Sequence, residues 1–145
     1  LAICLYAYCF GFLPALFVGI IYGILQFFQS SAYIFNYATF FLDFIFAFSS
    51  IVMMSVARKF IKNKGSFIIG LSMTFALRFF FHFLSGMLYF ENGGIWANLP
   101  KDNAFVYSFL YQITYILPDY LVCLAVVIPL QATKTTDKLF KMLEK

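Results

Sequence analysis

The chain alternates long apolar runs with short polar breaks, and the lengths of the runs predict its fold. Four runs, at residues 11–28, 34–57, 66–90 and 104–130, approach or exceed the roughly 20 apolar residues that a membrane span needs. We expect each to be a transmembrane helix, because an open sheet edge would leave backbone groups unsatisfied in lipid. The sequence therefore predicts an all-α membrane protein, a multi-span helical bundle forming a single membrane domain over residues 1–145.

The two ends of the chain differ from these spans. Residues 1–10 are apolar but too short to cross a bilayer, and the chain starts at Leu1 in the middle of this run. We interpret them as the end of a truncated helix, and we expect the chain to be a fragment. Residues 131–145 are predicted to be a basic amphipathic tail.

Composition and charge support a membrane location and give its orientation. The chain is 63% hydrophobic and only 11% charged, which excludes an ordinary soluble domain. Lys and Arg gather at residues 58–64 and in the tail, and two spans separate these regions, so both lie on one side. The positive-inside rule makes that side cytoplasmic. We expect a multi-pass cell-membrane protein with a cytoplasmic C-terminus, and the net charge of +4 does not indicate nucleic-acid binding.

Several kinds of chemistry are excluded by what the sequence lacks. It has one His, three Cys without metal-ligand spacing, and no nucleophile motif, so no metal, cofactor or catalytic set is expected. It also has no glycine-rich phosphate loop, so it cannot hydrolyse ATP itself. We therefore expect a binding protein and not an enzyme.

Four ionisable residues lie inside the predicted spans. They are Asp43, Arg78, His82 and Asp119. Such residues are expensive in lipid and are functional candidates by default. Arg78 and Asp119 both lie near the middle of their spans and are predicted to form a structural ion pair. His82 lies nearer the outer face and is assigned to a ligand pocket, although it could instead be a packing residue.

Aromatic and polar residues on three spans converge at similar depth near the outer face. The fourth span contributes Tyr107, Tyr111, Gln112 and Tyr115, and the outward loops add Tyr33 and Trp96. Together with an uncompensated carboxylate at Asp43, they predict a pocket for a flat, cationic heteroaromatic ligand. The alternatives are an interfacial tyrosine belt, close helix packing at Gly86, and a structural subunit whose polar residues only hold helices together.

Five segments, in order and at suitable separations, resemble a known family. They are "YGIL" (22–25), "AYIF" (32–35), "FLDFIFAF" (41–48), "RFFFHFLSGMLYF" (78–90) and "YSFLYQITYILPD" (107–119). Together they resemble the thiamine-specific substrate-binding (S) component of energy-coupling factor transporters. The last two motifs are specific in combination, and the similarity covers most of the chain from residue 11 to about residue 130.

The resemblance implies a six-helix protein that binds thiamine from outside with high affinity. It also implies a transmembrane coupling subunit and two cytoplasmic ATPase subunits as partners. The first helix, most of the second and the outer loop between them would be missing from this chain, which we therefore expect to bind thiamine poorly by itself. The same architecture recognising another vitamin or a thiamine precursor is the alternative.

Carried over position by position, the resemblance also implies a set of ligand contacts. These are Tyr33, Asp43, Phe44, His82, Gly86, Phe90, Tyr107 and Gln112. The chain departs from the family pattern at several places. The family usually has Trp where this chain has Tyr22 and Phe90. It usually has Tyr at the position of Phe44, and Asn at the position of Gln112.

Overall fold

All four predicted spans are helical in the computed structural model, which describes residues 1–30, 37–61, 65–91 and 102–133. Its elements are α1 (Ala2–Phe10), α2 (Phe12–Ser30), α3 (Tyr37–Phe40), η1 (Phe41–Phe46), α4 (Ala47–Ser49), α5 (Val52–Phe60), α6 (Ser66–Glu91) and α7 (Ala104–Ala132). These described residues contain no strand, and four helical stretches are long and apolar enough to cross a membrane. The prediction of an all-α, multi-span fold is confirmed.

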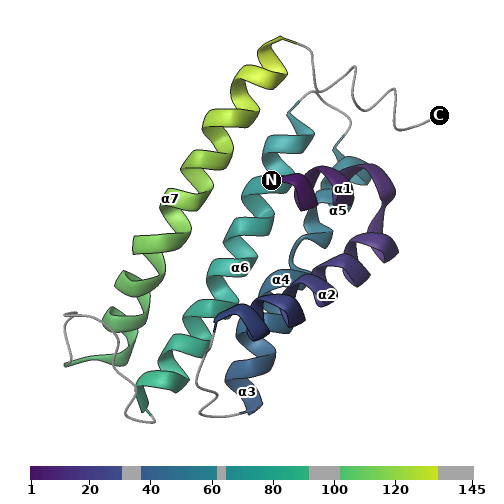
Figure 1. The fold of residues 1–145 in the computed structure, drawn as a ribbon. Coiled ribbons are helices and arrows are strands. Elements are labelled where there is room, and N and C mark those ends of the chain that lie inside the picture. The colour runs from purple at the N-terminus through teal and green to yellow at the C-terminus, as the bar shows by residue number, and fades with distance from the viewer. Residues whose placement is uncertain (31–36, 62–64, 92–101, 134–145) are drawn as a thin grey trace.

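The long helix α6 is the centre of the arrangement. It contacts α7 along one side, and α5, η1 and α4 along the other, while α1 and α2 pack outside these shorter elements. Figure 1 shows α6 and α7 side by side, with α2 crossing in front of the α3–α5 segment. An apolar core at one end joins α1, α5 and α6 through side chains such as Ala7, Met54 and Leu71, none of which is measurably exposed.

The second span is divided into four elements, although its sequence was predicted to form one continuous helix. Residues 41–46 form a π-helix, η1, and a turn at Ser50 and Ile51 separates α4 from α5. Ser50 Oγ donates to the Ala47 carbonyl at 2.6 Å, a local bond that competes with the helical ladder. A π-turn holds more residues per turn than an α-turn and is found frequently at functional sites. This one carries Asp43.

A glycine separates α1 from α2. Gly11 has φ 90° and ψ −174°, a conformation that is essentially restricted to glycine. It ends α1 after Phe10 and allows α2 to start in a new direction at Phe12. The short N-terminal run is therefore a helix of its own, distinct from the following span.

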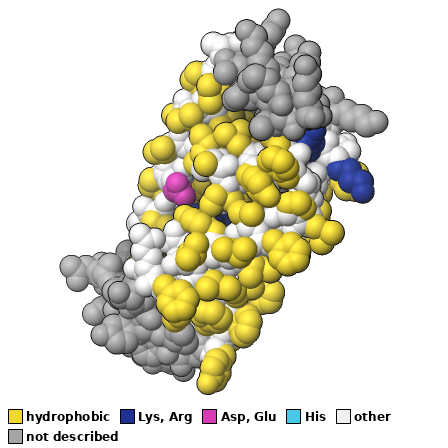
Figure 2. Space-filling model, turned by 45° about the vertical axis from the view of Figure 1, so that its right-hand side comes forward, with side chains coloured by type: hydrophobic (Ala, Val, Ile, Leu, Met, Phe, Trp, Pro, Cys, Tyr) yellow, Lys and Arg dark blue, Asp and Glu magenta, His cyan; other side chains and the backbone are white. Residues whose placement is uncertain are grey.

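The outer faces of the helices are apolar. Phe17 and Phe28 of α2 and Val122 of α7 are 64%, 75% and 64% exposed. Figure 2 shows hydrophobic side chains over most of the described surface on one face, with Lys and Arg side chains near one end. A surface of this kind suits contact with lipid, in agreement with a multi-pass membrane protein.

Candidate functional site

The Asp43 carboxylate is held between η1 and α6. Its Oδ1 lies 2.7 Å from His82 Nδ1, and its Oδ2 accepts a hydrogen bond of 2.6 Å from Ser85 Oγ. His82 and Ser85 are three residues apart, so one face of α6 presents both groups. Both are buried, whereas the Asp43 side chain is 31% exposed. Two side chains of α6 therefore hold the Asp43 carboxylate in place, while its role as a ligand contact stays a prediction.

Arg78 determines which nitrogen of His82 carries the proton. Arg78 Nε donates to His82 Nε2 at 3.5 Å, a long hydrogen bond. A guanidinium cannot accept, so Nε2 is the unprotonated nitrogen, and the Nδ1–H donates to Asp43. The imidazole thus links Arg78 to Asp43. The two residues that sequence reasoning separated by depth, Arg78 and His82, are in contact.

The same guanidinium also meets Asp119 of α7. Arg78 Nη1 lies 3.5 Å from Asp119 Oδ2, and the two side chains are 24% and 52% exposed. The structure thus brings together the two residues of the predicted ion pair, in a long and partly exposed arrangement. The Asp43 cluster, formed by Asp43, Arg78, His82 and Asp119, therefore contains two carboxylates and one guanidinium.

The interface of α6 with α7 contributes a buried amide. Gln112 is 3% exposed, and its Nε2 donates to the His82 carbonyl at 3.0 Å. Its Oε1 is buried without a hydrogen-bond partner among the described residues. Buried acceptors are normally paired, so this oxygen is a candidate contact for a ligand donor.

Gly86 explains why the two helices approach so closely here. A Cβ added at Gly86 would meet Ser108 Oγ of α7 and would lie 3.2 Å from Gln112 Nε2. Ser108 Oγ in turn donates to the Phe83 carbonyl of α6 at 2.6 Å. The packing alternative for Gly86 therefore has a direct geometric basis, while a ligand contact there stays a prediction.

A row of aromatic rings leads along α7 to the imidazole. The Phe90 ring lies 5.3 Å from that of Tyr107, and Tyr107 stacks on Tyr111 at 6.2 Å. Tyr111 then contacts Tyr115 at 5.6 Å, and Tyr115 lies 5.9 Å from the His82 ring. These tyrosines are four residues apart, so they share one helix face. They give the cluster a continuous aromatic wall.

A second set of aromatic rings near the cluster comes from α2 and α4. The Phe48 ring of α4 lies 4.7 Å below the Arg78 guanidinium and 6.3 Å from the His82 ring. Tyr22 of α2 packs edge-on against Phe48 at 5.1 Å. Side chains of α2, α4, α6 and α7 therefore contribute rings or charges to one region.

The predicted contacts fall into three groups. The structure brings together Asp43, His82, Gly86, Phe90, Tyr107 and Gln112 through direct or stepwise contacts. Phe44 packs elsewhere, with its ring 5.3 Å from Phe27 on the α2 side of η1. Tyr33 lies outside the described residues, as does Trp96.

Sequence reasoning left Ser85, Tyr115 and Phe48 out of the predicted contacts. Ser85 had a usable signal, because its spacing from His82 places both on one helix face. Tyr115 was recognised only as part of the outer aromatic set. Phe48 had no signal, because it is one of 22 phenylalanines in an apolar chain.

Two cavities in the described part of the chain lie apart from this cluster. One of about 350 Å³ is an apolar gap between α6 and α7, bordered by residues such as Phe75, Phe79 and Tyr120. The other, of about 690 Å³, lies where α1 meets α2, beside the end of α5. The candidate site is therefore defined by its polar contacts and aromatic rings.

Comparison with known proteins gives one match. A family model described as Thiamine transporter protein (Thia_YuaJ) matches residues 1–140 of the chain. Searches of the curated proteins and of the solved structures found no match.

Proposed function

The chain belongs to the thiamine transporter protein family, and from this premise we propose that it is the substrate-binding (S) component of an energy-coupling factor transporter. It is a membrane protein of thiamine uptake. In the proposed role it captures thiamine from the outside of the cell at the Asp43 cluster, to which η1, α6 and α7 contribute.

The observation that carries this proposal is the charge of the Asp43 cluster. Thiamine contains a cationic thiazolium ring, and the cluster of Asp43, Arg78 and Asp119 has one negative charge in excess. Asp43 is also fixed in place by His82 and Ser85, so its carboxylate is positioned before the ligand arrives. A preorganised anion beside aromatic rings suits a flat organic cation.

The second ring of thiamine, an aminopyrimidine, has a counterpart at Gln112. Its buried Oε1 lacks a hydrogen-bond donor among the described residues, and an exocyclic amino group would supply one. The partly buried ring of Phe90, which lies 5.3 Å from that of the buried Tyr107, is assigned to stack on the ligand near the outer end of the same site. Each of these assignments belongs to the proposal.

Energy for uptake would come from partner proteins. The sequence contains no phosphate-binding loop, so ATP hydrolysis is assigned to two cytoplasmic ATPase subunits, joined through a transmembrane coupling subunit. The proposal includes a cytoplasmic C-terminus, which agrees with the Lys and Arg distribution.

The test is thiamine titration by calorimetry on the full-length protein and its Asp43→Asn variant. Asn keeps the size of the side chain but removes the charge, so we expect thiamine affinity to fall about 10- to 100-fold. Size-exclusion chromatography in detergent should show that the variant remains folded.

Asp102→Asn is the matched control, because Asp102 is exposed just before α7 and lies outside the cluster. It removes the same charge and should leave thiamine affinity unchanged. Equal affinity of the Asp43→Asn variant and the unmodified protein would remove Asp43 from the binding site. Equal losses in both variants would reduce its role to long-range electrostatics.

A further inference from the structure

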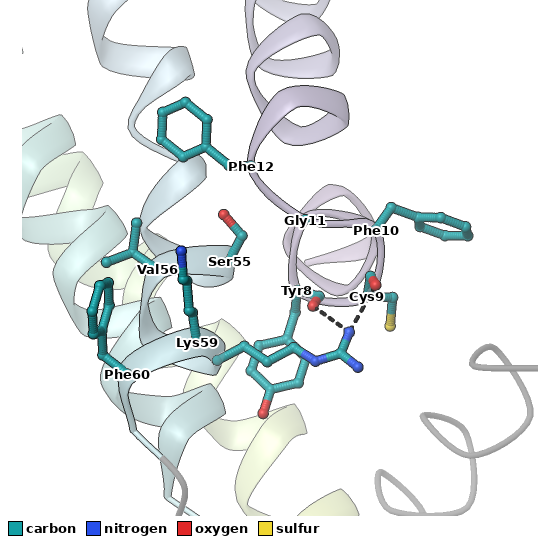
Figure 3. Close-up of a pocket in the computed structure, with 10 residues that line it drawn as sticks. Tyr8, Cys9, Phe10, Gly11, Phe12, Ser55, Val56, Lys59 and Phe60 are labelled. Atoms are coloured by element: carbon teal, nitrogen blue, oxygen red, sulfur yellow. Dashed lines mark hydrogen bonds between the residues drawn. The ribbon is translucent and has the colours of Figure 1, made fainter.

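A second charged region lies at the other end of the bundle, where the corner between α1 and α2 meets the last turn of α5. We propose that this cleft binds the headgroup of an anionic phospholipid. The cleft has a volume of about 690 Å³ and is bordered by Tyr8, Gly11, Phe12, Arg58, Lys59 and Phe60, among others (Figure 3).

The cleft lies where a membrane span ends. The span Tyr37–Phe60 ends with the last turn of α5, which contains Arg58 and Lys59. Phe60 is 74% exposed and Phe12 is 50% exposed, so apolar rings stand beside the cations. Basic residues next to exposed apolar rings are typical of the level at which headgroups meet the hydrocarbon core.

The cleft is positively charged. Among the described residues, its lining contains two cations and no acidic side chain. Arg58 Nη1 donates to the Tyr8 carbonyl at 2.9 Å and to the Cys9 carbonyl at 2.7 Å. These two bonds fix the guanidinium at the end of α1.

Lys59 is the residue placed to meet an anion. Figure 3 shows its ammonium directed toward Ser55 and Val56, in the space between α5 and the α1–α2 corner. The Phe60 ring, 5.7 Å from Lys59 Nζ, is the ammonium's partner among the described residues, and a ring does not cancel the charge. A phosphate group beside Lys59 would supply the missing negative charge.

The neighbouring surfaces favour a lipid over a soluble anion. The exposed rings of Phe12 and Phe60 offer apolar contact to acyl chains, which free phosphate lacks. Basic pockets between transmembrane helices bind anionic headgroups, and each Lys or Arg near the surface adds roughly a fivefold gain in affinity. Charge complementarity and the apolar rim therefore point to the same occupant.

The experiment is native mass spectrometry of the full-length protein released from nanodiscs that contain equal phosphatidylglycerol and phosphatidylcholine. We expect the unmodified protein to retain phosphatidylglycerol selectively. Lys59→Gln should reduce this retention about fivefold, and Lys59→Arg, which keeps the charge, should restore it. Both variants should bind thiamine as the unmodified protein does, which establishes that they are folded.

Lys101→Gln is the matched control, because it removes one lysine from the loop that is predicted to face outward. It should leave lipid retention unchanged. A competition experiment with glycerol 3-phosphate distinguishes a lipid headgroup from a soluble phosphate compound. We expect that glycerol 3-phosphate does not displace the lipid. Equal retention of the two lipids, equal retention by Lys59→Gln, or full displacement by glycerol 3-phosphate would each overturn the proposal.

Discussion

The Asp43 cluster and the cleft at Arg58 each place a guanidinium over an aromatic ring, but they hold it differently. Arg78 lies 4.7 Å above Phe48, and its other partners are the side chains of His82 and Asp119, each at 3.5 Å. Arg58 lies 5.5 Å above Tyr8, and it donates hydrogen bonds to two backbone carbonyls at 2.7 and 2.9 Å. Side-chain partners at long distances can rearrange around a ligand, whereas a guanidinium bonded to a helix end is fixed with the backbone.

The two regions also depend on glycine for different reasons. Near the cluster, an added Cβ at Gly23 of α2 would meet the Phe44 carbonyl of η1, so the helices leave no space for it. At the cleft, nothing lies within 4 Å of a Cβ added at Gly11, but its φ of 90° suits only glycine. One glycine allows close packing, and the other allows a backbone turn.

The largest expected effect comes from Gly23→Ala. The atom that obstructs the new methyl group belongs to the backbone of η1, so α2 or η1 must shift, and we expect a loss of about 3 kcal/mol of stability. Because η1 carries Asp43, thiamine affinity should fall as well. Thermal unfolding in detergent and calorimetric titration measure the two effects. Full thiamine affinity in this variant would mean that η1 is positioned independently of α2.

Gly11→Ala should have a smaller effect that is confined to the cleft. The strained backbone should cost about 1–2 kcal/mol, and because no neighbour obstructs the methyl group, the helices need not separate. We expect a lower unfolding temperature and weaker phosphatidylglycerol retention at unchanged thiamine affinity. A loss of thiamine binding equal to that of Gly23→Ala would show that the two regions are coupled.

Asp119→Asn should have the smallest effect on stability. The pair with Arg78 is long and the Asp119 side chain is 52% exposed, so its removal should change stability by less than about 1 kcal/mol. The unfolding midpoint of the full-length protein measures this change. A loss of several kcal/mol would identify Asp119 as a strong structural partner of Arg78.

The spans were predictable from the sequence because length and hydropathy determine them. The structure places their ends within about one helical turn of the predicted positions. The π-helix was not predictable, since residues 41–46 contain neither Gly nor Pro, and its register depends on packing against α2 and α6. The polarity of one α6 face indicated a site, but only the fold places η1 beside that face.

The contacts within the site were predictable in part. Asp43 and His82 could be assigned to similar depths, but their 2.7 Å contact depends on how η1 faces α6. Phe44 shows where prediction of the contacts failed. It follows Asp43 directly in the sequence, but its side chain packs toward Phe27 of α2 and away from the cluster. Helical spacing within one span gives shared faces, while contacts between spans need the packing geometry.

The hydrogen bonds of His82 restrict how this residue can act. Nε2 accepts from Arg78 and Nδ1 donates to Asp43, so both nitrogens are already engaged before any ligand enters. Both polar atoms of the imidazole are therefore occupied, and His82 as a whole is only 8% exposed, with the rings of Phe48 and Tyr115 beside it. In the proposed site, the histidine would therefore meet the ligand through its ring and not through a new hydrogen bond to a nitrogen.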